Sequence, residues 1–190
     1  MTKIELFNLA LGRIGIRPLT GPHDERQEAV FCNQFFPSAL DEVLDLASFA
    51  CSLKRTFLAR LEEKPDFDFL YAYSLPTDFL HIVRMEKETP FALESGRLLC
   101  NLEQCAILYV RRVKDTSELP PHAANCVVLN LAAKLATALS NNPSLAERLL
   151  NELYNIALPN ARTSDTMQKH SFPGHPFWTS PKGECNLWRS

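Results

Sequence analysis

A proline ends the clearest β-strand pattern in this chain. Before it, two tyrosines alternate with alanine and serine in residues 71–74, the period-2 pattern of a half-covered strand. Pro76 lacks a backbone donor and holds the preceding residue in an extended conformation, so the strand cannot continue through it. Residues 76–78 suit a single helical turn with proline at its start. Apolar residues within 80–85 then restart a strand.

Helical periodicity lies on both sides of this β-rich stretch. Apolar residues recur every three to four positions in four segments between residues 4 and 156. Amphipathic helices joined by short turns are typical of an antiparallel bundle. We therefore expect a mainly α fold, an antiparallel helical bundle over residues 1–163, with a β-rich insert at about 67–115 and an extended C-terminal tail.

Capping residues and prolines predict where the helices begin and end. Thr2 and Glu5 form a capping box for the first helix, and Asp24 is a cap for the second. Pro37 lies within the apolar stripe of the second helix, where we expect a kink or a short break. Pro159 is expected to interrupt the fourth helix.

The β-rich insert is expected to hold strands at 69–74, 80–87 and 106–113. A tight hairpin is expected at Ser95-Gly96, because glycine supplies the positive φ that a two-residue turn needs.

Several motifs, taken in order, resemble one established family. The run over residues 69–80 resembles the "YxLPxDxL" signature of the adaptor proteins of short-tailed phages, called tail tubular protein A or head-to-tail adaptors. Residues 11–20 are similar to the family's N-terminal "LRxIGxxPxT", and residues 115–136 to its "D…LPxxF…AAxLA". The similarity covers residues 4–168. The signature positions in this sequence are Tyr73, Leu75, Pro76, Asp78 and, in the following hairpin, Gly96.

The resemblance implies a structural virion protein rather than an enzyme. Members of the family form twelve-subunit rings beneath the capsid's portal, and genomic DNA passes through the lumen without sequence-specific binding. The implied partners are thus the portal ring, the next tail (nozzle-type) protein and other copies of this chain. The implied location is the tail connector of the virion, after assembly in the host cytoplasm.

The C-terminal residues differ in composition from the rest. Residues 164–190 hold three prolines, two glycines and no helical period. Aromatic anchors on such a segment usually fill pockets on a partner, although folding back on the bundle is the alternative. We expect a partner-binding tail whose deletion abolishes portal attachment without changing the melting temperature. Its aromatic residues are Phe172, Phe177, Trp178 and Trp188.

No catalytic constellation is present in the sequence. It contains no Gly-rich phosphate loop, no Gly-x-Ser-x-Gly and no His-Glu-x-x-His motif. His170, His175 and Cys185 could bind zinc, but their spacing matches no standard site. We therefore expect no catalytic residue, no metal and no cofactor, and we expect the six cysteines to be small buried hydrophobes. An enzyme of unknown type is the weakest alternative.

The main alternative is a small helical DNA-binding regulator. The basic pairs Lys54-Arg55 and Arg111-Arg112 make it conceivable. The net charge of −2 argues against it, because neutralising phosphates requires concentrated lysine and arginine. No apolar run approaches 18 residues, so no membrane span is expected.

Overall fold

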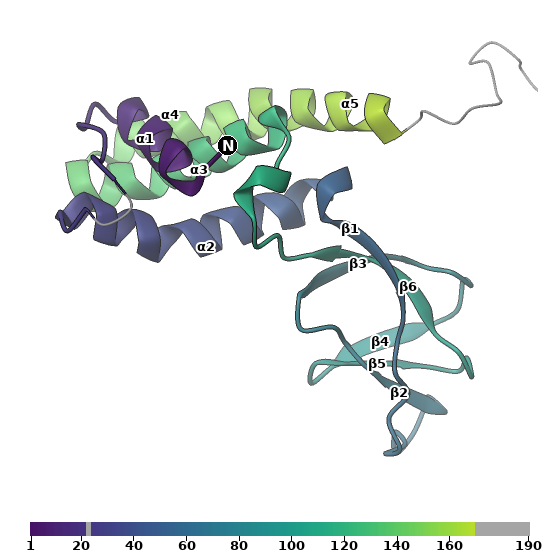
Figure 1. The fold of residues 1–190 in the computed structure, drawn as a ribbon. Coiled ribbons are helices and arrows are strands. Elements are labelled where there is room, and N and C mark those ends of the chain that lie inside the picture. Colours follow the sequence, from purple (N-terminus) through teal and green to yellow (C-terminus); the bar gives the residue numbers. More distant parts are fainter. Residues whose placement is uncertain (22–23, 170–190) are drawn as a thin grey trace, which may run out of the picture.

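The computed structural model describes residues 1–21 and 24–169. Its helices form one layer, and its strands form a separate unit below one end of that layer (Figure 1). The helices are α1 (Lys3–Arg13), α2 (Gln27–Ala47), α3 (Pro121–Ser140), α4 (Pro143–Glu152) and α5 (Leu158–Lys169), with short 3-10 turns at Ala50–Ser52 (η1) and Thr116–Glu118 (η2). The strands are β1 (Leu53–Phe57), β2 (Tyr71–Ser74), β3 (Phe79–Met85), β4 (Phe91–Glu94), β5 (Arg97–Cys100) and β6 (Ala106–Arg111).

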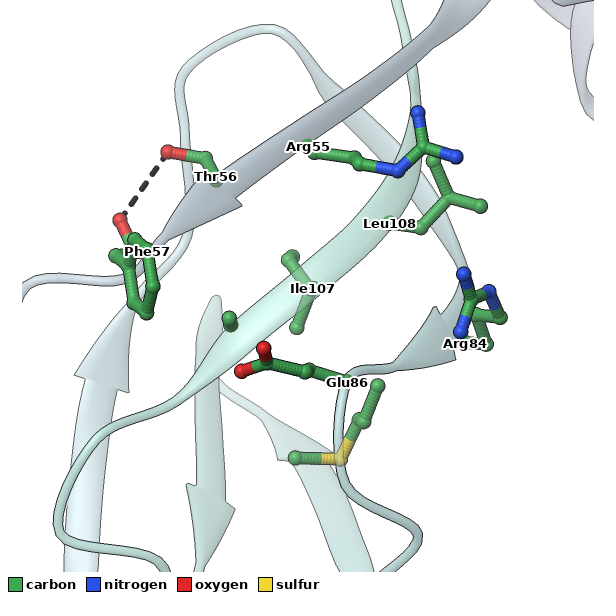
Figure 2. A pocket seen from close by; sticks show the side chains of 9 residues that line it. Arg55, Thr56, Phe57, Arg84, Glu86, Ile107 and Leu108 are labelled. Carbon is green, nitrogen blue, oxygen red and sulfur yellow. Dashed lines mark hydrogen bonds between the residues drawn. The ribbon is translucent and has the colours of Figure 1, made fainter.

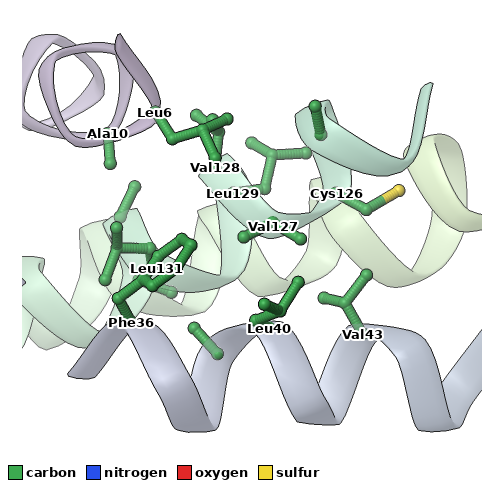
Figure 3. Packing of buried hydrophobic residues seen from close by; sticks show 14 of the residues in the cluster. Leu6, Ala10, Phe36, Leu40, Val43, Cys126, Val127, Val128, Leu129 and Leu131 are labelled. Atoms are coloured by element: carbon green, nitrogen blue, oxygen red, sulfur yellow. The ribbon is translucent and has the colours of Figure 1, made fainter. Parts of the chain in front are cut away.

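Helix α3 is the centre of the helical layer. It packs against α1, α2, α4 and α5, and residues on all its sides are buried. Figure 3 shows Leu6 of α1 and Phe36 and Leu40 of α2 directed toward α3. Full burial of one leucine side chain contributes about 1.5–3 kcal/mol, so each leucine buried against α3 stabilises the layer appreciably.

The apolar character of α3 follows from this central position. Within the described residues, α3 is the one helix that is long and apolar enough to cross a membrane by length and composition. However, 67% of its most apolar window is buried inside the protein. The core helix of a folded domain has the same composition, so this feature is weak evidence for a membrane span.

The predicted starts of the first two helices can be checked against the hydrogen bonds of their capping residues. The capping box is confirmed: Thr2 Oγ1 accepts from the Glu5 amide at 3.3 Å, and Glu5 accepts from the Thr2 amide at 2.9 Å. The prediction of Asp24 as a helix cap is wrong, because α2 begins three residues later. The Asp24 carboxylate instead accepts from the amides of Thr20 and Arg26, and the hydrogen bond from the Arg26 guanidinium lowers the pKa of Asp24.

Neither interior proline breaks the helical path. Helix α2 continues through Pro37 without an interruption. A wider π-helical turn, Leu153–Ala157, connects α4 to α5, and the path continues through Pro159. Proline leaves one carbonyl a turn earlier without its helical donor. The buried faces of these helices offset that loss.

Helix α5 also changes the boundary of the predicted tail. It ends at Lys169, so the first six residues of the segment 164–190 are helical rather than extended. Phe172, Phe177, Trp178 and Trp188, with the zinc candidates His170, His175 and Cys185, lie outside the described residues.

The strands form two antiparallel three-stranded sheets. Sheet A has the order β1-β6-β3, and sheet B has the order β2-β5-β4. The chain leaving β1 joins them, because Leu61 donates to the Ala72 carbonyl and Ser74 to the Ala59 carbonyl. The two sheets enclose a second core, separate from that of the helices, formed by Leu58, Tyr73, Met85, Leu98, Cys100, Cys105, Ile107 and Tyr109.

The prediction of a mainly α bundle is therefore wrong. The described residues are 50% helical and 19% strand, and the strands bury a core of their own. The sequence-based prediction placed the start of the β region at about 67, whereas the region begins with β1 at Leu53. The β unit also separates α2 from α3 in the chain, so these neighbouring helices are not joined by a short turn.

The hairpin prediction is confirmed. Glu94 of β4 pairs with Arg97 of β5 across a two-residue turn. Ser95 and Gly96 have φ angles of 49° and 73°, as both central residues of a type I′ turn require.

Candidate functional site at the junction of the helices and the β unit

Strand β6 contributes residues to the cores of both structural units. Tyr109 is fully buried in the core between the sheets, whereas the next residue, Val110, belongs to the helical core. This division follows from the pleat, because successive strand residues point to opposite faces. Leu80 of β3 also packs against the helical core. The end of sheet A that holds Leu80 and Val110 thus packs against the helical layer.

The signature segment forms the turn at this junction. Phe79 donates its amide to the Pro76 carbonyl at 3.0 Å, so residues 76–79 form a β-turn rather than the expected helical turn. The amide of Arg112, which follows β6, donates to the Asp78 carbonyl at 2.6 Å. The turn before β3 is therefore fastened to the chain that leaves β6.

The carboxylate of Asp78 extends this connection into the β unit. It accepts hydrogen bonds from the Tyr109 hydroxyl at 2.9 Å and from the Lys54 ammonium at 3.4 Å. Burial by itself would raise the pKa of Asp78, but these two donors together lower it below its usual value. Burial and the neighbouring carboxylate both raise the pKa of Tyr109. Asp78 is thus held as an anion.

Polar side-chain contacts connect helix α2 to the β unit around the same turn. The Arg112 guanidinium donates to the Asp41 carboxylate at 2.8 Å and 3.0 Å. His81 Nδ1 lies 2.5 Å from Asp45 Oδ1, and its Nε2 lies 3.1 Å from the Ser48 hydroxyl. These contacts fix the orientation of β3 and β6 relative to α2.

Arg111 makes a separate connection on the opposite side of β6. Its guanidinium donates to the Cys51 carbonyl at 3.2 Å and pairs with the Glu118 carboxylate. The adjacent arginines at 111 and 112 therefore have different acceptors, as expected for neighbouring residues of an extended chain. They do not act as a single clamp.

The other signature residues lie at different places. Tyr73 is buried between the sheets and donates its hydroxyl to the Leu102 carbonyl. Leu75 packs against the same core. Gly96 lies in the β4–β5 hairpin of sheet B, so the structure does not bring it to the junction. The signature therefore supports the β core and the junction, and it does not converge on one pocket.

Sequence reasoning missed the partners that make Asp78 important. Tyr109, Arg112 and Asp41 lie 31 or more positions from their partners, and no local pattern marks them. The contacts of His81 with Asp45 and Ser48 likewise join residues 36 and 33 positions apart.

A second polar contact fastens helix α5. The Asp165 side chain is almost completely buried, and its oxygens lie 3.0 Å and 3.2 Å from the Ala50 amide at the start of η1. His122 Nε2 lies 3.8 Å from the same carboxylate, and the His122 ring lies against Phe49. Helix α5, although near the end of the chain, is therefore tied to the turn that leads into β1.

The described residues hold no arrangement typical of catalysis or metal binding. Within residues 1–21 and 24–169, no group of three His, Cys, Asp or Glu side chains is placed to hold a metal ion. Burial raises the pKa of Cys32, Cys51 and Cys126 to about 11, which keeps these thiols protonated and unreactive. What the junction can do is hold two structural units in a fixed relative orientation.

No protein-family model matches the sequence, and no curated protein matches it either.

Proposed function

We propose that this protein is a structural head-to-tail adaptor of a short-tailed phage or prophage. In this role it attaches to the portal ring, forms a ring with other copies of the chain, surrounds the passing DNA and receives the next tail protein. The proposal rests on the ordered motifs that resemble the tail tubular protein A family. It requires no catalysis and no cofactor.

One observation carries the proposal beyond the motif match. The signature residues Tyr73, Leu75 and Asp78 all have structural roles, because they form part of the β core and connect it to the helical layer. A signature of this kind suits a subunit that must keep its shape within an assembly. An enzyme's signature would be expected around a pocket with nucleophiles, acids or bases.

The charge pattern supports this proposal over a DNA-binding regulator. Of the four basic side chains in the pairs Lys54-Arg55 and Arg111-Arg112, three are paired with carboxylates of the same chain. Cationic groups that are already paired with carboxylates contribute less to phosphate binding, because their charge is compensated. A channel through which DNA slides also needs no base-reading helix.

The test is attachment to portal rings. The full chain is mixed with purified portal protein of the same virus or prophage and analysed by sedimentation and negative-stain electron microscopy. We expect an added ring of density on one face of the portal. A chain ending at Lys169 should lose this attachment, because it lacks the four aromatic residues of the tail. Trp178→Ala should weaken attachment more than Trp188→Ala, because Phe177 adjoins Trp178.

A matched control removes an exposed aromatic side chain elsewhere. Tyr154→Ala changes an exposed tyrosine between α4 and α5, and it should leave attachment unchanged. Failure of the full chain to bind portal rings would overturn the proposal. Retarded migration of random duplex DNA at physiological salt would favour the regulator instead.

A further inference from the structure

The outer face of sheet A carries a hollow of about 310 Å³ below the helical layer. Its floor is Leu108 of β6, which is paired with Arg55 of β1 on one side and with Arg84 of β3 on the other. Figure 2 shows both arginine side chains beside Leu108, with Phe57 at the far end of the hollow. The site is thus an apolar floor between two guanidinium groups.

Neither of these arginines forms an ion pair with a carboxylate in the described part of the chain. Arg13, Arg97 and Arg112 each pair with a carboxylate, whereas Arg55 and Arg84 have no such partner among residues 1–21 and 24–169. Glu86 also lines the hollow but forms no ion pair there. The Phe57 residue is 70% exposed. The lining thus holds two arginines and one glutamate, a net positive charge, and it fits an apolar group flanked by carboxylates that face Arg55 and Arg84.

The same chain displays such a group at the loop before β2. Phe67 is 77% exposed, more than any other large hydrophobic residue in the described part of the chain. Carboxylates flank it at Asp66 and Asp68, and neither has an ion-pair partner among the described residues. Asp68 has a φ of 64°, and the Phe69 amide donates to the Phe67 carbonyl at 2.8 Å. This tight turn presents the phenylalanine between its two acidic neighbours.

We propose that the Asp66-Phe67-Asp68 loop of one copy docks in the Arg55–Arg84 hollow of a second copy. Phe67 packs on Leu108, and the two aspartates face the two guanidinium groups. Binding hot spots are enriched in aromatic and arginine anchors that fill pockets, and arginine–carboxylate hydrogen bonds are stronger than those between neutral groups. Loop and hollow are different surfaces, so the contact is head-to-tail and continues from copy to copy into a ring or a filament.

Other segments of this chain fit the Arg55–Arg84 hollow less well. The chain does not fill its own hollow, because Phe67 remains exposed. Residues 170–190 contain a single acidic side chain, Glu184, beside the basic Lys182 and Arg189, so no aromatic residue there lies between two aspartates as Phe67 does. The inference rests on the proposed function in that it names the lateral contact of the proposed ring.

The test uses two full-length variants, each lacking one side of the contact. The hollow variant is Arg55→Ala with Arg84→Ala. The loop variant is Asp66→Asn, Phe67→Ala and Asp68→Asn, where asparagine tolerates the positive φ at position 68. Circular dichroism checks that each is folded. Analytical ultracentrifugation over a concentration series measures self-association.

We expect the wild type to self-associate and each variant alone to do so at least about tenfold more weakly. An equimolar mixture should form heterodimers and nothing larger, because only one intact loop and one intact hollow remain per pair. The control Arg17→Ala with Arg148→Ala removes two exposed arginines from elsewhere and should associate like the wild type. A monomeric wild type, or variants that associate as it does, would overturn the contact.

The same proteins separate this inference from the proposed function. If all of them decorate portal rings fully and associate alike, the function stands and the contact is wrong. If heterodimers form but no protein attaches to portal rings, the contact stands and the function is wrong. If no heterodimers form and an added acidic protein binds the wild type but not the hollow variant, the partner is foreign and the assignment to a second copy is wrong.

Discussion

The hydroxyl of Tyr109 donates a hydrogen bond to the carboxylate of Asp78 over 2.9 Å. Tyr109 lies on the central strand of sheet A, and Asp78 lies in the turn before β3. The Asp78 carbonyl accepts from the Arg112 amide, and the Arg112 guanidinium pairs with Asp41 of α2. One continuous path of hydrogen bonds thus leads from the β core to the helical layer.

Removing the Tyr109 hydroxyl should weaken this path. Tyr109→Phe leaves the partly buried carboxylate of Asp78 with one donor fewer, so the free energy of unfolding should fall by about 1–3 kcal/mol. Urea denaturation measures the change. Lys54→Ala is the control, because its side chain is 52% exposed and such pairs contribute at most about 1 kcal/mol. Equal effects of the two substitutions would contradict the assigned role of Tyr109.

The same carboxylate should make stability depend on pH. The folded state lowers the pKa of Asp78 below its unfolded value of about 3.9, so its contribution is present above that pH. The contribution is lost as the pH falls through the folded pKa. The difference in unfolding free energy between wild type and Asp78→Asn should therefore be constant near neutral pH and shrink below about pH 4. A difference that grows on acidification would show that the folded state does not lower the pKa of Asp78.

The end of the chain should divide into a stabilising part and a dispensable part. A chain ending at residue 163 loses Asp165, whose buried carboxylate accepts from the Ala50 amide. We expect it to melt at a clearly lower temperature, and Asp165→Ala to cost about 1–3 kcal/mol. A chain ending at Lys169 should melt like the full chain. Glu147→Ala, an exposed carboxylate on α4, is the control and should have no measurable effect.

Two glycines should respond oppositely to the same substitution. Gly96 has a φ of 73° in the hairpin turn, so Gly96→Ala should cost about 1–2 kcal/mol in backbone strain. Gly12 lies in α1 with open space around it, so Gly12→Ala should stabilise by about 0.5–1 kcal/mol. Thermal denaturation compares them. Loss of stability in both variants would point to side-chain packing rather than backbone conformation.

Local features of the chain were predictable from the sequence because neighbouring residues decide them. The Thr2–Glu5 capping box, the Ser95-Gly96 turn and the strand that ends before Pro76 all depend on a few adjacent residues. Each is set by steric limits on φ or by hydrogen bonds within one turn.

The fold class and the junction were decided only by tertiary contacts. Strand β1 has no strong pattern of its own and forms because β6 supplies its hydrogen-bond partners. Helix α2 continues through Pro37 because burial of its apolar face offsets the missing hydrogen bond. The contact between Asp78 and Tyr109 spans 31 positions, and the contact between Asp165 and Ala50 spans 115. Periodicity reports which face of a segment is buried, but only the packed chain determines what that face meets.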